Sequence, residues 1–181
     1  MPTVSKLDAT LIEFIRTQPL FFVATAAPDG HVNVSPKGLD SLRVLSESKV
    51  IVIWLNLTGS GNETAAHVRE SPRMTLMFCA FAGEARIVRV YGSARVIHPA
   101  DGDWNIVVQH FPAMAGSRQI FELDIGLVQI SCGTGVPLMS VVKQRGPDEL
   151  LPYYEDMGPD GVQAYWNRKN KLSLNGRPTG I

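Results

Sequence analysis

Two short stretches of the chain carry residue types that bind phosphate. The first is Gly59-Ser60-Gly61-Asn62-Glu63-Thr64, a glycine-rich loop that leads from an apolar run into a short helical pattern. Glycines let the backbone approach a ligand closely, and the free N–H groups of a helix N-terminus attract anions. The second is Val34-Ser35-Pro36-Lys37-Gly38, which places a hydroxyl and an ammonium group at the end of an expected strand. Together the two stretches predict a site for a phosphorylated cofactor.

The length and composition predict one globular domain that spans residues 1–181. With 181 residues, 45% of them hydrophobic, the chain can bury a core without disulfides or metals. Its formal net charge is zero, which argues against binding to nucleic acid or to an anionic membrane. Neither the two cysteines nor the four histidines have metal-ligand spacing. No apolar run is long enough to span a membrane, and the N-terminus lacks a signal-peptide pattern. We therefore expect a soluble, cytoplasmic protein without a metal site.

Changes in the hydrophobic period divide the chain into expected helices and strands. Apolar residues recur at helical spacing behind Ser5, the expected N-cap, at Leu7, Leu11, Phe14 and Ile15. Pro28-Asp29-Gly30 predicts the turn of a hairpin, because proline presets φ and glycine accepts positive φ. The expected strands are 20–26, 31–35, 43–46, 50–55, 73–81, 86–97 and 121–132, and the further helices are 62–70, 101–110 and 161–170.

Two of these strands indicate the architecture. The strand at 50–55 is apolar on both faces and is therefore expected at the centre of a sheet. The strand at 86–97 alternates, and Gly92 in its middle suits a sharp bend. Six or so strands with hairpin connections and few helices predict a mainly β fold, an antiparallel β-barrel with peripheral helices. A parallel doubly wound sheet is not expected, because no glycine fingerprint follows the first strand.

The ordered set of motifs resembles the pyridoxamine 5'-phosphate oxidase-like family. The resemblance covers residues 7–132, from the N-terminal helix through the hairpin, the two candidate phosphate stretches and Arg86-Ile87-Val88-Arg89-Val90-Tyr91-Gly92. It implies an FMN-binding split barrel of antiparallel Greek-key type, with residues 160–181 as a C-terminal helix and tail. True oxidases carry two basic residues where Asn62 and Glu63 stand. The resemblance is therefore to the family and not to the true oxidase.

The resemblance implies that FMN lies along the second strand of the hairpin and the loop before the short helix. In the family a basic residue of that strand contacts the cofactor, which assigns Lys37 to this role here, with Asn33 and Ser35 beside it. The phosphate would be held at the loop by Ser60, Asn62 and Thr64.

The resemblance also implies a homodimer with a cofactor site shared between the subunits. Trp54 or Leu55 would lie near the isoalloxazine ring. Trp166 is the second residue of an aromatic pair, Tyr165-Trp166, which is followed by hydrogen-bond donors. It is expected to pack against the partner subunit near its flavin.

Each of these residues also has a purely structural interpretation. Lys37 can be a solvated charge, and Asn62 can serve only as the N-cap of the short helix. Trp54 can belong to the core, and Trp166 can seal its own barrel instead of a partner's site. His67 on the short helix is expected to be a surface or capping histidine.

No Ser/His/Asp arrangement and no pair of carboxylates stands out, which suits a protein whose cofactor supplies the chemistry. We therefore predict an FMN-binding flavoprotein, an oxidoreductase that passes hydride from a small substrate to N5 of the flavin. The sequence identifies neither the substrate nor the electron acceptor. It also assigns no role to Cys132, which stands directly before Gly133. A non-catalytic flavin-binding or sensing module and a related barrel that uses deazaflavin or haem are the alternatives. The absorption spectrum of the purified protein separates them.

Overall fold

The structure is a computed structural model that describes residues 2–45 and 51–181. Two of the expected strands begin or end in the gap, so Ser46 and Val50 lie outside the described residues. The strands are β1 (Thr3–Val4), β2 (Phe21–Thr25), β3 (Asn33–Lys37), β4 (Leu42–Leu45), β5 (Ile51–Leu57), β6 (Arg73–Cys79), β7 (Arg86–Ile97) and β8 (Ser117–Cys132). The helices are α1 (Ala9–Thr17), α2 (Glu63–Glu70), α3 (Trp104–Val107) and α4 (Leu151–Lys169), with short helical turns η1 (Val108–His110) and η2 (Gly146–Leu150).

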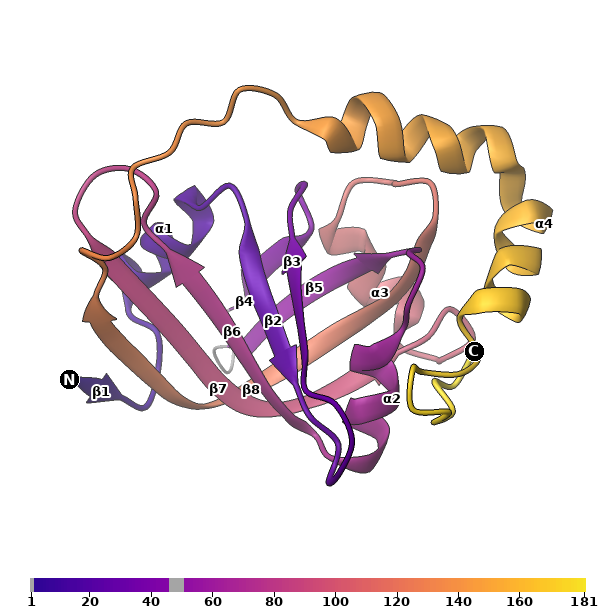
Figure 1. Cartoon of the computed structure of the whole chain (residues 1–181), viewed down its shortest axis with the longest axis horizontal. Helices are drawn as coiled ribbons and strands as arrows, with labels where there is room; N and C mark the ends of the chain where they lie inside the picture. The colour runs from indigo at the N-terminus through magenta and orange to yellow at the C-terminus, as the bar shows by residue number, and fades with distance from the viewer. Residues whose placement is uncertain (1, 46–50) are drawn as a thin grey trace.

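All of these strands belong to one antiparallel sheet with the order β3-β2-β6-β7-β8-β5-β4, and β1 pairs with β8. The sheet curls so that β2 and β3 lie across from β4 and β5 (Figure 1). The predicted mainly β fold is therefore confirmed: the sheet forms a curled half-barrel with a few helices around it, consistent with a split barrel. Among the described helices, none is both long and apolar enough to cross a membrane.

The expected burial of β5 on both faces is confirmed. Val52 and Trp54 point into the barrel, where Trp54 stacks on Phe121 at 4.5 Å between ring centroids and meets the edge of Phe21 at 6.2 Å. Ile53 and Leu55, which flank Trp54 in the strand, point to the other face, into a second cluster that also includes side chains of α3. The strand therefore separates two hydrophobic clusters.

The expected bend at Gly92 is also present. The register of β7 against β8 shifts between Tyr91 and Gly92. A Cβ atom at position 92 would lie 2.0 Å from the backbone oxygen of Asp124. Only glycine permits this close approach of two strands, as is common where a sheet bends to close on itself.

The helix boundaries differ from those predicted, because local side chains decide where helices begin. Asp8, not Ser5, caps α1, since its Oδ1 accepts a hydrogen bond from the Leu11 N–H at 2.8 Å. The expected helix at 101–110 is one α-helical turn followed by the 3-10 turn η1. The last helix begins at Leu151 instead of Gly161. It continues through a kink at Gly158, where φ is +67°.

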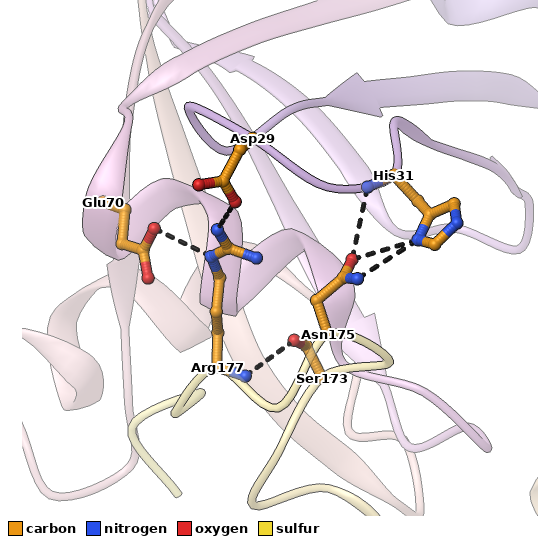
Figure 2. Close-up of polar contacts among 6 residues, drawn as sticks. All are labelled: Asp29, His31, Glu70, Ser173, Asn175 and Arg177. Carbon is orange, nitrogen blue, oxygen red and sulfur yellow. Dashed lines mark hydrogen bonds and ion pairs between the residues drawn. The ribbon is translucent and has the colours of Figure 1, made fainter.

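The residues after α4 form a tail that docks on α2 and on the hairpin turn between β2 and β3 (Figure 2). Arg177 donates to Glu70 at 2.8 Å and also pairs with Asp29. Asn175 accepts from the His31 N–H through its Oδ1 at 3.2 Å. The tail therefore ties three parts of the molecule together that are far apart in the sequence.

Candidate functional site

Two cations, Lys37 and Arg118, lie in the interior, and neither has an acidic partner within residues 2–45 and 51–181. Lys37 ends β3 and is half-buried, with its Nζ 5.2 Å from the centroid of the Trp54 ring. Arg118 lies at the start of β8 and is only 3% exposed. Its Nε and Nη1 atoms have no hydrogen-bond partner among the described residues. Buried cations of this kind are rare unless something else neutralises them.

A β-bulge explains how Arg118 reaches its position. Gln119 pairs with Asn56 and Ser117 pairs with Leu57, so Arg118 is the extra residue between two paired positions. A bulge redirects the side chain of its extra residue, and bulges are common beside functional sites.

The electrostatics of the two groups agree with their burial. Desolvation lowers the pKa of Lys37 to about 8, with a further contribution from the charge of Arg118. Desolvation also lowers the pKa of Arg118 to about 10, although Tyr154 and Tyr165 act in the opposite direction. None of the perturbing groups is a carboxylate. Arg118 lies near enough to contribute to the lowered pKa of Lys37, and an anion bound at both side chains would favour their charged forms.

Two further donors in the interior lack partners among the described residues, the Ser35 hydroxyl and the Trp54 indole N–H. Ammonium, guanidinium and indole groups can only donate hydrogen bonds, and a hydroxyl can donate. The unpaired set therefore requires acceptors. A ligand with phosphate and carbonyl oxygens has the matching chemistry, and buried polar atoms without partners are costly in its absence.

Asn33 and Thr64 of the predicted site lie against one another. The Asn33 Nδ2 donates to the Thr64 Oγ1 at 3.1 Å, which joins β3 to the first turn of α2. Thr64 is buried, whereas Ser60 is exposed at the turn of the loop. The structure thus brings Asn33, the residue directly before the second predicted phosphate stretch, into contact with the last residue of the first stretch.

Asn62 occupies the N-cap position of α2, but its side chain does not cap the helix, so the capping interpretation is wrong. Instead Asn62 is 2% exposed, and its Oδ1 accepts from the Gln119 Nε2 at 2.7 Å. Its Nδ2 lies 3.4 Å from the Asn170 carbonyl oxygen. The side chain of Asn62 is a buried link between the loop, β8 and the tail.

Helix α4 and the tail hold the loop from outside. The Trp166 Nε1 donates to the Thr58 Oγ1 at 2.7 Å, so this tryptophan contacts its own chain. The Asn170 Nδ2 donates to the Gly59 carbonyl at 2.9 Å. The Glu63 carboxylate accepts from the Leu174 N–H at 2.9 and 3.0 Å. Glu63 is therefore directed to the tail, where its negative charge has a donor.

His67 and Cys132 each have a side-chain contact within the chain. His67 is 1% exposed and its Nδ1 lies 3.1 Å from the Thr25 Oγ1, so the expectation of a surface or capping histidine is wrong. Cys132 is exposed, and its Sγ lies 3.1 Å from the Thr134 Oγ1. Over the described part of the chain, no three His, Cys, Asp or Glu side chains gather where they could hold a metal ion.

Arg118 is the residue that sequence reasoning missed. The strand was expected to begin at Phe121, which left Arg118 and Gln119 in a loop, whereas β8 begins at Ser117. The available signal was an arginine two residues before the apolar run that begins at Ile120, a position where a solvated loop charge is the ordinary interpretation.

Comparison with known sequences gives a family and a relative. The family model described as Pyridoxamine 5'-phosphate oxidase matches residues 7–132. The Pyridoxamine 5'-phosphate oxidase family protein ustO of Aspergillus flavus is 42% identical over 188 residues, which cover 95% of this chain and 75% of the relative.

Comparison with solved structures finds the same fold at low sequence identity. HupZ of Group A Streptococcus matches with a TM-score of 0.53 and 17% identity over 75% of this chain and all of HupZ. A pyridoxamine 5'-phosphate oxidase-related, FMN binding protein of Nostoc punctiforme matches with a TM-score of 0.50 and 14% identity. That match covers 66% of this chain and 76% of the other.

Proposed function

We propose that this chain, which belongs to the pyridoxamine 5'-phosphate oxidase family, binds FMN and acts as an oxidoreductase on a small substrate. The observation that carries the proposal is that two inward-facing cations, the half-buried Lys37 and the buried Arg118, have no carboxylate partner among the described residues. FMN brings both a phosphate dianion and a ring with accepting oxygen and nitrogen atoms. The FMN binding protein of Nostoc punctiforme has the same fold.

The unpaired donors suit this cofactor. Arg118 and Lys37 would neutralise its negative charge, and Ser35 and Trp54 would donate to its accepting atoms. Trp54, which stacks on Phe121 and meets the edge of Phe21, would present an apolar surface next to Lys37. When bound, FMN supplies the capacity to take up a hydride at N5, and the protein supplies orientation and electrostatics.

The first prediction concerns the spectrum of the protein. We expect oxidised-flavin absorption in protein purified from cells or reconstituted with FMN, and tighter binding of FMN than of riboflavin because charge-assisted contacts to the phosphate are strong. The measurement is a titration of both flavins followed by quenching of their fluorescence. Equal affinities would remove the basis for a phosphate site.

A Soret band or a deazaflavin spectrum would assign the barrel to another cofactor. Reduction of the bound flavin by electron donors, followed by turnover, would separate an enzyme from a flavin-sensing module.

The second prediction concerns pH. Because the folded-state pKa of Lys37 is lowered to about 8, the folded protein disfavours the charged lysine that the unfolded chain retains. The free energy of unfolding of FMN-free protein is therefore expected to rise as pH increases from about 8, up to the ordinary lysine pKa of about 10.4. Urea unfolding across this range measures it, with Lys37→Met expected to flatten the rise. The exposed Lys171→Met is the control. A rise that is the same in both variants would mean that other groups cause it.

We also propose that the protein is a homodimer with sites shared between subunits. The edge strand β3 and the residue before it expose Val34 and Val32 at 61% and 70%, an apolar surface at the same strand that carries Lys37. Such a surface suits a partner subunit. We expect Val34→Glu to lower the mass measured in solution from that of a dimer to that of a monomer. Ile106→Glu, on a residue 68% exposed elsewhere, should leave the mass unchanged. An unchanged dimer in Val34→Glu would move the interface away from β3.

A further inference from the structure

A large pocket lies between the barrel and the segment that connects β8 to α4. We call residues 133–145 the crossing segment, because they pass above β2 and β3 in the view of Figure 1 before the chain enters η2 and α4. The pocket has a volume of about 740 Å³. Pockets of this size commonly hold small molecules.

The crossing segment is fixed on either side of the pocket. At one end the Met139 N–H donates to the Phe81 carbonyl oxygen at 2.9 Å. Directly after the other end, Gly146, the first residue of η2, packs on Leu39, so that a Cβ atom at position 146 would lie 2.0 Å from the Leu39 Cδ2. Between these two points the segment forms one wall of the pocket. The segment that forms this wall is therefore held in place by contacts on both sides of the pocket.

The pocket walls are mainly apolar. They come from four separate parts of the chain: the residues just before β2, the end of β3 with the residues after it, Phe81 after β6, and the crossing segment with η2 and the start of α4. The apolar side chains include Leu20, Leu39, Phe81, Met139, Val141 and Leu150. Met139 and Val141 keep more than half of their surfaces exposed, although they face a pocket. A ligand with an apolar body would cover this surface and gain the corresponding free energy.

The charges around the pocket favour an anionic group on that ligand. Lys37 and Arg145 line the pocket, and neither forms an ion pair within the described residues. Lys143 also lines it but is paired with Asp148 at 3.1 Å. One carboxylate, Glu149, belongs to the lining. The uncompensated charge is therefore positive, and its most buried member is Lys37.

We propose that the pocket binds an apolar organic anion, a carboxylate on an aliphatic or aromatic body, with the carboxylate at Arg145 and Lys37 and the body against the crossing segment. This inference rests on the proposed function in one respect, because it takes this ligand to be the substrate of the flavin site. Lys37 borders both the pocket and the Trp54 ring, so it would join the two sites.

Binding of octanoate, measured by calorimetry on FMN-free and on FMN-loaded protein, tests the proposal. Octylamine and 1-octanol have the same chain length with a different charge. We expect octanoate to bind at least about tenfold more tightly than octylamine, and Arg145→Ala to weaken octanoate binding about tenfold. Equal binding of octanoate and octylamine would overturn the assignment of an anion site.

A matched pair of variants tests the location. Val141 lines the pocket, whereas its neighbour Val142 is 96% exposed and does not. Val141→Trp is expected to abolish octanoate binding by filling the space, and Val142→Trp to leave it intact. An equal loss in both variants, or in neither, would place the ligand elsewhere.

Three substitutions separate this proposal from the proposed function. Arg145→Ala should weaken octanoate binding alone, Arg118→Met should weaken FMN binding alone, and Lys37→Met should weaken both. Loss of FMN binding with retained octanoate binding would contradict only the flavin proposal. FMN binding without any octanoate binding would contradict only the pocket proposal.

Discussion

Replacing Arg118 with methionine is expected to have opposite effects on stability and on cofactor binding. Methionine fills a similar length without a charge, so the FMN-free protein should gain about 1 kcal/mol or more in its free energy of unfolding, because an unpaired buried cation is removed. FMN binding should weaken by about 1.5–3 kcal/mol, roughly 10- to 150-fold, because charged hydrogen bonds to the ligand are lost. Urea unfolding and flavin fluorescence titrations measure the two quantities.

The opposite signs make this result hard to mimic. A residue that only supports the fold would lose stability and binding together. Arg73→Met is the control, because Arg73 is exposed and donates only to the Ser71 Oγ among the described contacts, at 3.0 Å. It should change both quantities by less than about 0.5 kcal/mol. If Arg118→Met destabilises the FMN-free protein, Arg118 has a structural partner and the anion site is wrongly placed.

The largest loss of stability is expected from Gly92→Ala. The new Cβ atom would lie 2.0 Å from the Asp124 backbone oxygen, and backbone cannot move aside as a flexible side chain can. Strands β7 and β8 would have to separate at the bend, in the middle of the longest pairing in the sheet. We expect a loss of about 3 kcal/mol or more in the free energy of unfolding.

Gly126→Ala is the matched control for this prediction. Gly126 lies on β8, opposite the same part of β7, and the nearest atom to its new Cβ would be the Tyr91 backbone oxygen at an ordinary 3.7 Å. A change of less than about 1 kcal/mol is expected. If both variants lose the same stability, the cost comes from alanine in β8 and β7 generally and not from the close approach at the bend.

The parts of the fold that depend on local pattern were predictable from the sequence. The apolar run of β5 indicated burial on both faces, the alternation over residues 86–97 indicated a strand, and Gly92 in its middle indicated a bend. Both signals arise from a few adjacent residues. The start of β8 was not predictable, because a bulge at Arg118 depends on pairing with β5, which lies about 60 residues away.

The residues of the candidate site were likewise predictable from the sequence only in part. The contacts between Asn33 and Thr64 and between Lys37 and Trp54 join residues that the sequence had singled out. Asn62 was selected for its place before a helix, which favours capping, yet a buried partner on β8 takes its side chain. Tertiary contacts overrode the local preference in this case, as they did for the buried His67.

The docked tail has a consequence for the order in which the molecule assembles. Several of its hydrogen bonds join positions more than 100 residues apart, such as Asn170 with Gly59 and Asn175 with His31. Contacts of this kind close long loops, whose entropy must be lost before they contribute any stability. The sheet can therefore form first, and the loop at 58–64 acquires its outer neighbours only in a late step. In native-state hydrogen exchange, the amides of this loop and of the tail would then open together, as one cooperative unit that is less stable than the barrel beneath it.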